Sequence, residues 1–263
     1  MSGKRAERAS LTIVGTGIDA GGQFTPQARA FFAAADEAFY LVADPVAVRL
    51  LEWLNPKARS LHTHYGDGKD RLETYEGMAE EILAPVRRGR DVCAAFYGHP
   101  GIYVYPARVA VERARAEGFS AKMLPGVSSL DCLFADLGLD PALTGCQIHH
   151  ATELFVRRIE PDTASLLILL QIGAIGQTAH HDQPDWSNLP ILVEYLIGFY
   201  PPAHEVTAYE ASPYPLTRPV IKRVPLEGLA ETELTVGMTL VVPPATARAV
   251  DPTMLARLEQ RRR

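Results

Sequence analysis

The first half of the chain alternates short apolar runs with helical patterns, and this alternation constrains the fold more than any other feature. The apolar runs are typical of buried strands and cover residues 11–14, 38–42, 60–64, 92–97 and 121–124. Helical stretches lie between them, such as residues 70–88, where apolar side chains recur at intervals of three and four. Strands that alternate with helices form a parallel sheet covered on both faces. The sequence therefore predicts an α/β protein.

The second half of the chain continues the pattern less regularly. We expect strands at residues 166–171, 205–209, 220–224 and 234–242, and helices near 133–135 and 191–199. No internal repeat or low-complexity linker separates the two halves. We place the domain boundary after residue 127, which divides the chain into domains 1–127 and 128–263.

Charge and apolar pattern argue against several classes of protein. The net charge is −5, and the basic clusters near the two ends are short, which disfavours general nucleic-acid binding. No apolar run approaches the roughly 18 residues that a membrane span needs, and no signal-peptide core precedes the first strand. The cysteines form neither a disulfide framework nor a metal-ligand spacing. We expect a cytoplasmic protein with no membrane or nucleic-acid partner.

The stretch F-Y-G-H-P-G at residues 96–101 follows the predicted strand at 92–97. Ligands of open α/β sheets bind beyond the carboxyl ends of strands, and glycines let a ligand approach backbone amides closely. The stretch is therefore a candidate cofactor loop. Its alternative is a plain glycine-containing turn.

Residues 15–20, G-T-G-I-D-A, fit the G-x-G-x-x-A pattern of dinucleotide-binding proteins. Asp44 could supply the acidic partner, but it lies further along the chain than the usual ~20 residues. The helix is expected to begin only near Thr25, too far from the second glycine to face a pyrophosphate. No Gly-Lys-Ser/Thr follows, which excludes a P-loop.

Histidine pairs are the only other metal-like pattern. They occur at residues 62 and 64, 149 and 150, and 180 and 181, without acidic or cysteine partners at ligand spacing. We therefore expect no metal site. There is also no G-x-S-x-G nucleophile elbow.

Residues 65–75, Y-G-D-G-K-D-R-L-E-T-Y, carry a chemically useful pair. Arg71 and Tyr75 are four apart at the start of a predicted helix, so they lie on neighbouring turns, and Tyr65 enters from the preceding loop. A guanidinium beside a phenol favours the phenolate and can hold an oxyanion. The alternative is that Tyr75 borders the core while Arg71 is solvated.

Several motifs together resemble one family. They are L-T-I-V-G-T-G-I at 11–18, the 65–75 and 96–101 stretches, K-M-L-P-G-V-S at 122–128, D-C-L-F-A-D-L-G-L-D-P at 131–141 and Q-I-G at 171–173. This series resembles the borosin peptide α-N-methyltransferases, which are similar in fold to the tetrapyrrole (uroporphyrin-III C) methyltransferases. The resemblance covers nearly the whole chain.

The resemblance implies two α/β/α domains with S-adenosylmethionine in the cleft between them. It implies methyl transfer to backbone amide nitrogens of a peptide, with S-adenosylhomocysteine as product, and a homodimer, as a 2:2 complex with the precursor. The chain ends just past the catalytic region, so we expect a separate precursor protein methylated in trans. A fused protein trimmed before its core peptide would have the same sequence.

Site residues follow from the resemblance position by position. The catalytic residues that it implies are Arg71, Tyr75, Tyr97 and Tyr65. The cofactor contacts that it implies are Tyr97, His99, Ile102, Ser128, Ser129, Gln171, Ala211 (or its neighbour Glu210), Met238 and Thr239. The chain departs from the fused enzymes at His62 and His64, where those have tyrosines, so the packing around the substrate channel and the peptide preference are open.

These residue types suit amide methylation, because an amide nitrogen becomes nucleophilic only as its proton leaves. Tyr75, with its pKa lowered by Arg71, could take the proton, while Arg71 and Tyr65 could stabilise charge on the carbonyl oxygen. Two alternatives are a small-molecule methyltransferase of the tetrapyrrole type and a non-catalytic binding partner that keeps the cofactor. The tetrapyrrole enzymes usually have proline after the second glycine, where this chain has Ile18.

Overall fold

The computed structural model describes residues 9–181 and 183–260, which fall into two compact units. The N-terminal unit takes in residues 1–139, 177–184 and 210–220, and the C-terminal unit takes in residues 140–176, 185–209 and 221–263. The N-terminal unit thus extends beyond residue 127 and includes two segments from the second half of the sequence.

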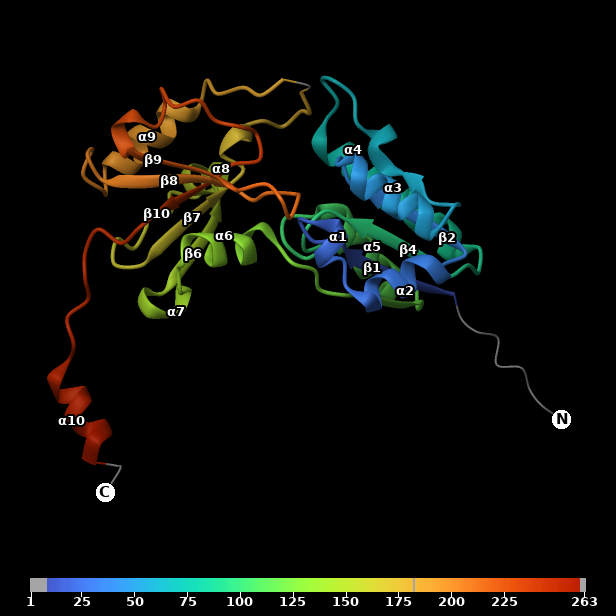
Figure 1. Ribbon diagram of the computed structural model, residues 1–263, viewed down its shortest axis with the longest axis horizontal. Helices are drawn as coiled ribbons and strands as arrows, with labels where there is room; N and C mark the ends of the chain where they lie inside the picture. The colour runs from blue at the N-terminus through green and yellow to red at the C-terminus, as the bar shows by residue number, and fades with distance from the viewer. Residues whose placement is uncertain (1–8, 182, 261–263) are drawn as a thin grey trace. The chain divides into compact units, whose positions relative to one another are not determined.

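The N-terminal unit is built on one sheet of five parallel strands in the order β3-β2-β4-β1-β5 (Figure 1). The strands are β1 Ser10–Gly15, β2 Glu37–Leu41, β3 Arg59–Ser60, β4 Val92–Phe96 and β5 Ser120–Met123. Because all strands run the same way, their carboxyl ends meet at one edge. The parallel α/β arrangement predicted from the alternating pattern is confirmed.

Helices connect these strands and cover both faces of the sheet. They are α1 Ala20–Gln23, α2 Pro26–Ala34, α3 Pro45–Leu54, the 3₁₀ turn η1 Leu61–His64, α4 Arg71–Arg87 and α5 Tyr105–Ala116. The same unit includes α6 Ser129–Leu137, which follows β5. Leu11 and Ile13 of β1 pack with α4 and α5, whereas Val14 packs with α1, α2 and α3. Alternate residues of each strand point to opposite faces, so the sheet buries apolar side chains on both sides.

The helices α2, α3 and α4 each begin after a polar residue whose side chain caps the first turn. Thr25 accepts a hydrogen bond from the amide of Ala28 at 3.2 Å, with proline in the first turn, as predicted. The carboxylates of Asp44 and Asp70 cap α3 and α4 in the same way, at 2.8 and 2.9 Å from their amides.

Two local expectations for this unit were wrong. The expected strand at 60–64 ends after Ser60, whose hydroxyl accepts from the amide of His62 and turns the chain into η1. A short helix, α1, also precedes the one that begins after Thr25, because Asp19 caps it through the amide of Gly21 at 2.9 Å.

The C-terminal unit contains a mixed sheet in the order β6-β7-β10-β8-β9. Its strands are β6 Cys146–His150, β7 Leu166–Leu170, β8 Glu205–Glu210, β9 Val220–Pro225 and β10 Thr239–Val242. β6 and β7 are parallel, whereas β10 is antiparallel to both β7 and β8. The amino end of β10 therefore lies at the same edge as the carboxyl ends of β7 and β8.

Helices of the second half pack against this sheet or follow it. They are α7 Pro141–Thr144, α8 Ala151–Val156, η2 Ile172–Ala174, α9 Leu189–Ile197, η3 Leu226–Gly228 and α10 Pro252–Gln260. Residues of α8, α9 and the two 3₁₀ turns share an apolar cluster with alternate residues of β7, β8 and β10. No helix in the described ranges is both long and apolar enough to cross a membrane.

The expectations for the second half were less complete. The sequence pattern missed β6, α7, α8 and α10. The expected strand at 234–242 is a strand only from Thr239, because a turn closed by the amide of Met238 and the carbonyl of Thr235 precedes it.

Candidate active site

The candidate cofactor loop leaves the carboxyl end of β4 and is interlocked with the loop that leaves β1. Gly17 and Gly98 exchange two backbone hydrogen bonds, at 3.1 and 3.3 Å. A Cβ on Gly15 would lie 2.2 Å from the carbonyl oxygen of Gly98, and one on Gly126 would lie 2.5 Å from the same oxygen. These two glycines therefore allow backbone to pack on backbone, whereas Gly98 is required by its φ of +69°.

The side chains of this loop are held by short local contacts. Nδ1 of His99 accepts from the amide of Gly101 at 3.0 Å, and the carbonyl of His99 accepts from the amide of Ile102 at 3.0 Å. Tyr103 follows with a φ of +62°, a conformation that costs free energy for a residue with a side chain. The loop is a shaped structure and not a plain turn.

Tyr97 begins this loop with a ring that is 46% exposed. Desolvation raises the pKa of its hydroxyl to about 12, and the charges of Glu210, Cys132 and Asp44 act in the same direction. Tyr97 is therefore a protonated phenol at neutral pH, which can donate a hydrogen bond. The side chains that act on its pKa, Glu210, Cys132 and Asp44, are different from those at the start of α4.

The G-T-G-I-D-A stretch does not offer free amides for a pyrophosphate. The side-chain oxygen of Gln23 accepts from the amides of Ile18 and Asp19, at 2.8 and 3.1 Å. The helix begins closer to the glycines than expected, but the amides of Ile18, Asp19 and Gly21 already donate to side chains of the protein. This supports the interpretation of the stretch as a structural turn.

The N-terminus of α6 carries Ser128 and Ser129. The Ser128 hydroxyl accepts from the amide of Asp131 at 3.2 Å and donates to its carboxylate at 2.9 Å, and that carboxylate also accepts from the Ser128 amide. This is a capping box, so the Ser128 hydroxyl is used by the helix. The spacing of Ser128 and Asp131 is the sequence signal of such a box, and it was not used to predict the start of this helix.

A pocket of about 320 Å³ in the N-terminal unit brings Ala211 beside Val127, the residue before Ser128. The segment at 210–220 reaches this unit through Tyr214, whose hydroxyl donates to the Asp44 carboxylate. The structure thus places the expected contact at Ala211 near the one at Ser128, and both residues are buried.

Three expected cofactor contacts lie in the C-terminal unit. Gln171 follows β7, while Met238 and Thr239 stand at the start of β10, so all three occupy one edge of the second sheet. Gln171 has a φ of +61° and an exposed side chain, whereas Met238 and Thr239 are buried. A non-glycine residue held in the left-handed region is a candidate for function.

Arg71, Tyr75 and Tyr65 are brought together at the start of α4. The rings of Tyr65 and Tyr75 meet edge to face, with centroids 6.5 Å apart. Tyr75 also packs against the apolar core beside α4, so it borders the core and faces Tyr65 at once. Arg71 is the first residue of the helix, and its Nε donates to the carbonyl of Ala179 at 3.2 Å.

Burial and the Arg71 guanidinium act on the pKa of Tyr65 in opposite directions. Desolvation raises the pKa of this phenol above its usual range, and the proximity of Tyr75 raises it further, whereas Arg71 lowers it. Burial outweighs the guanidinium, so Tyr65 is protonated at neutral pH. It is suited to donate a hydrogen bond to an oxygen that gains negative charge.

The sequence pattern did not indicate that residues 178–180 contribute to this cluster of side chains. His180 was considered only as part of a metal-like pair, yet its ring lies on that of Tyr65, with centroids 4.6 Å apart. No local signal connects these residues to Arg71, because 108 positions separate Arg71 from Ala179.

His62 and His64, the two positions at which the chain departs from the fused enzymes, have different surroundings. Nε2 of His64 lies 2.6 Å from the carboxylate of Glu81, and its ring covers Gly77 on α4. His62 lies against Tyr65, with ring centroids 5.6 Å apart. His64 therefore braces α4, whereas His62 borders the tyrosine cluster.

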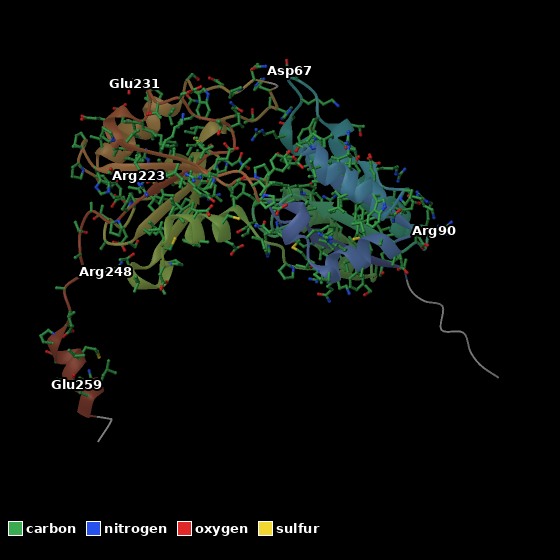
Figure 2. All side chains as sticks on the ribbon, in the orientation of Figure 1. Asp67, Arg90, Arg223, Glu231, Arg248 and Glu259 are labelled. Carbon is green, nitrogen blue, oxygen red and sulfur yellow. The ribbon has the colours of Figure 1, made fainter. Side chains whose placement is uncertain are left out.

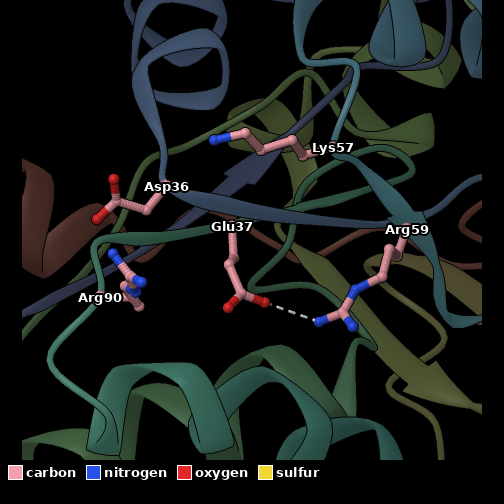
Figure 3. Close-up of a pocket in the computed structure, with 5 residues that line it drawn as sticks. All are labelled: Asp36, Glu37, Lys57, Arg59 and Arg90. Carbon is pink, nitrogen blue, oxygen red and sulfur yellow. Dashed lines mark hydrogen bonds and ion pairs between the residues drawn. The ribbon is translucent and has the colours of Figure 1, made fainter.

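The opposite end of the N-terminal unit holds a second pocket, of about 350 Å³ (Figure 3). Figure 2 labels Asp67, which precedes α4, and Arg90, which follows it, at opposite ends of the unit. The pocket is lined by Asp36, Glu37, Lys57, Arg59 and Arg90, and an ion pair of 2.9 Å joins Glu37 to Arg59. It lies at the amino ends of the strands, away from the tyrosine cluster.

Within the described ranges, no group of three or more His, Cys, Asp or Glu side chains could hold a metal ion.

Comparison with known proteins places the chain in a family. The sequence model of the tetrapyrrole (corrin/porphyrin) methylases matches residues 10–215. The chain belongs to the tetrapyrrole methylase family. The fold agrees: a solved uroporphyrin-III C-methyltransferase from Thermus thermophilus, complexed with S-adenosylhomocysteine, superposes with a TM-score of 0.59 at 17% identity, covering 89% of this chain and 92% of that one. The expected fold class is therefore confirmed.

Two curated relatives of this tetrapyrrole methylase are peptide-precursor proteins by name. The methyltransferase/ribosomally synthesized cyclic peptide dendrothelin A precursor of Dendrothele bispora is 39% identical over 98% of this chain and 63% of its own length. The methyltransferase/ribosomally synthesized type I borosin cyclic peptide precursor of Serendipita vermifera is 38% identical over 98% of this chain and 64% of its own length. The chain thus spans less than two thirds of each relative.

Proposed function

We propose that this protein is an S-adenosylmethionine-dependent methyltransferase that methylates backbone amide nitrogens of a ribosomal peptide precursor. The observation that carries the proposal is the cluster of Arg71, Tyr65 and Tyr75 at the start of α4. The relatives named above support a peptide substrate, because their names join a methyltransferase to a cyclic-peptide precursor.

The residues around Tyr97 fit the proposed cofactor. The carboxylates of Glu210 and Asp44 act on Tyr97, and negative surroundings favour a sulfonium cation. When bound, the cofactor supplies a methyl group on positively charged sulfur. In this proposal the first unit contributes Tyr97, His99, Ile102, Ser128, Ser129 and Ala211 to the binding of the cofactor, and the second contributes Gln171, Met238 and Thr239.

The tyrosine cluster has a distinct task for each side chain. Charge moves onto the carbonyl oxygen of the substrate amide as the proton leaves its nitrogen. Tyr65 is a protonated phenol and, with the Arg71 guanidinium, donates to that oxygen. Tyr75 is then the residue that takes the amide proton, because the environment of Tyr65 keeps that phenol from acting as the base.

Holding these groups in place matters as much as their chemistry. A phenolate is too weak a base to deprotonate an amide fully in solution, so alignment of the nitrogen with the methyl group supplies much of the rate. We also propose that the active protein is a homodimer and that its precursor is supplied as a separate chain.

Mass spectrometry tests the proposal. The probe is the part of the Dendrothele bispora relative that this chain does not match, given as a separate polypeptide and, in a second arm, fused to this chain. We expect stepwise gains of methyl mass, with fragment ions that assign each methyl to a backbone nitrogen. Binding of S-adenosylhomocysteine without methylation in either arm would contradict peptide methylation, and methylation of the fusion alone would contradict action in trans.

The family supplies a second candidate, methylation of a tetrapyrrole, because the family model covers residues 10–215. Incubation with uroporphyrinogen III and the methyl donor separates the two candidates. Arg71→Ala and Tyr75→Phe separate both from a non-catalytic binding protein, since they should abolish turnover while cofactor binding persists.

A further inference from the structure

Residues 177–184 come from the second half of the sequence but belong to the N-terminal unit. Part of this segment pairs with the loop that carries the tyrosine cluster. The amide of Gly68 donates to the carbonyl of His180 at 2.9 Å, and the amide of His180 donates to the carbonyl of Lys69 at 2.8 Å. The two stretches thus form a short antiparallel ladder next to the start of α4.

The ladder continues onto Arg71 itself. Its amide is one of the first amides of α4, which have no partner within the helix, and it donates to the carbonyl of Thr178 at 2.9 Å. Its side-chain Nε donates to the carbonyl of Ala179 at 3.2 Å. Both the backbone and the guanidinium of Arg71 are therefore oriented by the 178–179 backbone, and these contacts do not use the two terminal nitrogens of the guanidinium.

Tyr65 is held from the same segment. The His180 ring lies on the Tyr65 ring at a centroid distance of 4.6 Å and an interplanar angle of 33°. Tyr75 meets Tyr65 edge to face at 87°, and His62 lies further away, at 5.6 Å. His180 is thus the ring closest to Tyr65, and it restricts the direction in which the phenol hydroxyl points.

One further group in the segment is left with hydrogen-bonding capacity. Nε2 of Gln177 is buried and has no acceptor among the residues that the structure describes. A buried amide donor without an acceptor is costly and is rare in a folded protein, so a partner outside the chain would account for it. This places an unused donor in the segment that orients Arg71.

We propose that His180 is a positioning residue of the methyl-transfer reaction, and that residues 177–181 form one wall of the site for the peptide substrate. This rests on the proposed function. His180 stacks on Tyr65 while its backbone completes the ladder that orients Arg71. The pair of hydrogen-bond donors to the substrate carbonyl is thereby held at a fixed spacing.

Three variants test the role of the ring. His180→Ala removes the stacked ring, His180→Phe keeps a ring without titratable nitrogens, and His181→Ala is the matched control. His181 is the neighbouring residue, and its ring lies 3.4 Å from the carboxylate of the exposed Asp67. The substrate is the Dendrothele bispora polypeptide probe described above.

We expect His180→Ala to lower kcat about 10-fold or more, with KM for the probe and the Kd for S-adenosylhomocysteine within about 3-fold of wild type. His180→Phe should restore kcat to within about 3-fold, and His181→Ala should leave it within about 2-fold. A wild-type kcat for His180→Ala, or a kcat for His180→Phe as low as that of His180→Ala, would overturn the proposal.

Hydrogen exchange gives a readout that needs no turnover. The amides of Gly68 and Arg71 both donate into the ladder, so their exchange should be faster in His180→Ala and close to wild type in His180→Phe. Unchanged exchange in His180→Ala would overturn the positioning role. If wild-type protein fails to methylate the probe, the proposed function fails, and the exchange rates still decide whether His180 holds the loop.

Discussion

Arg71 donates a hydrogen bond from Nε to the carbonyl oxygen of Ala179 at 3.2 Å, although the two residues are 108 positions apart in the chain. This contact fixes one edge of the guanidinium and does not use its two terminal nitrogens. Arginine can do both at once because its donors form a rigid planar fork.

Arg71→Lys should therefore impair methyl transfer even though it keeps the charge. A lysine ammonium cannot donate to Ala179 and present two further donors in the same plane, so we expect kcat to fall about 100-fold. The Kd for S-adenosylhomocysteine, measured by calorimetry, should stay within about 3-fold. Arg88→Lys, in an exposed ion pair with Glu37, is the control and should behave as wild type. Equal rates for both variants would show that charge alone is sufficient.

Gln177→Leu should leave the free energy of unfolding of the ligand-free protein unchanged or raise it by about 1 kcal/mol, because it removes a buried donor that has no acceptor among the described residues. The control is Gln147→Leu. The Gln147 side chain donates to Asp162 and Ser165 at 3.0 and 2.8 Å, so its loss should cost about 2 kcal/mol. Urea denaturation compares the two, and equal losses would mean that the Gln177 amide is satisfied within the folded chain.

Gly15→Ala should destabilise the N-terminal unit and displace the candidate cofactor loop. The new Cβ would lie 2.2 Å from the carbonyl oxygen of Gly98 and 2.7 Å from Pro100, and neither backbone nor ring can yield easily. We expect a loss of about 3 kcal/mol in urea denaturation. Gly228→Ala is the control, since its Cβ would meet Pro225 at an ordinary 3.5 Å. A small effect at Gly15 would show that the two loops can separate without cost.

Asn55→Asp should destabilise the protein more at neutral than at acid pH. The side-chain amide of Asn55 is buried and donates to the carbonyls of Phe32 and Ala35, both at 3.0 Å. The introduced carboxylate would face these carbonyls without a proton, so its folded pKa would be raised above the unfolded value of about 4. The loss should be about 3 kcal/mol at pH 7 and smaller near pH 4, and a loss independent of pH would contradict this account.

Tyr97 should remain a neutral donor over the working pH range. Because the folded pKa is raised to about 12 from an unfolded value near 10, the stability from the protonated form is complete below about pH 10 and is lost as the pH rises towards 12. The ratio of the S-adenosylhomocysteine dissociation constants of Tyr97→Phe and wild type should therefore be constant between about pH 7 and 9.5. A ratio that changes through this range would indicate a phenolate in the site.

Local pattern was enough to predict much of the N-terminal unit. The alternation of apolar runs and helical periods predicted its parallel sheet, and Thr25 followed by proline predicted the start of α2. The four-residue spacing of Arg71 and Tyr75 predicted neighbouring turns of one helix, which α4 confirms. Each of these features depends on interactions between residues close in sequence or on a simple repeat.

The second half was harder to predict because its elements have weaker local signals. The strand β6 has the sequence C-Q-I-H-H and lacks a strong apolar run, so it becomes a strand by pairing in parallel with β7. The start of β10 is set by the turn at Met238 and by its antiparallel register with β7 and β8. Pairing partners of this kind cannot be identified from the strand itself.

The sequence by itself determined the class of fold, the helix that carries Arg71 and Tyr75, and the glycine-containing loop after β4, since periodicity, capping and backbone freedom are local properties. Only the tertiary structure decided that residues 178–180 orient Arg71 and stack on Tyr65, and that burial keeps Tyr65 protonated against the influence of the guanidinium. Contacts between distant segments and the desolvation of a side chain exist only once the chain has packed, because both depend on neighbours that the local sequence does not specify.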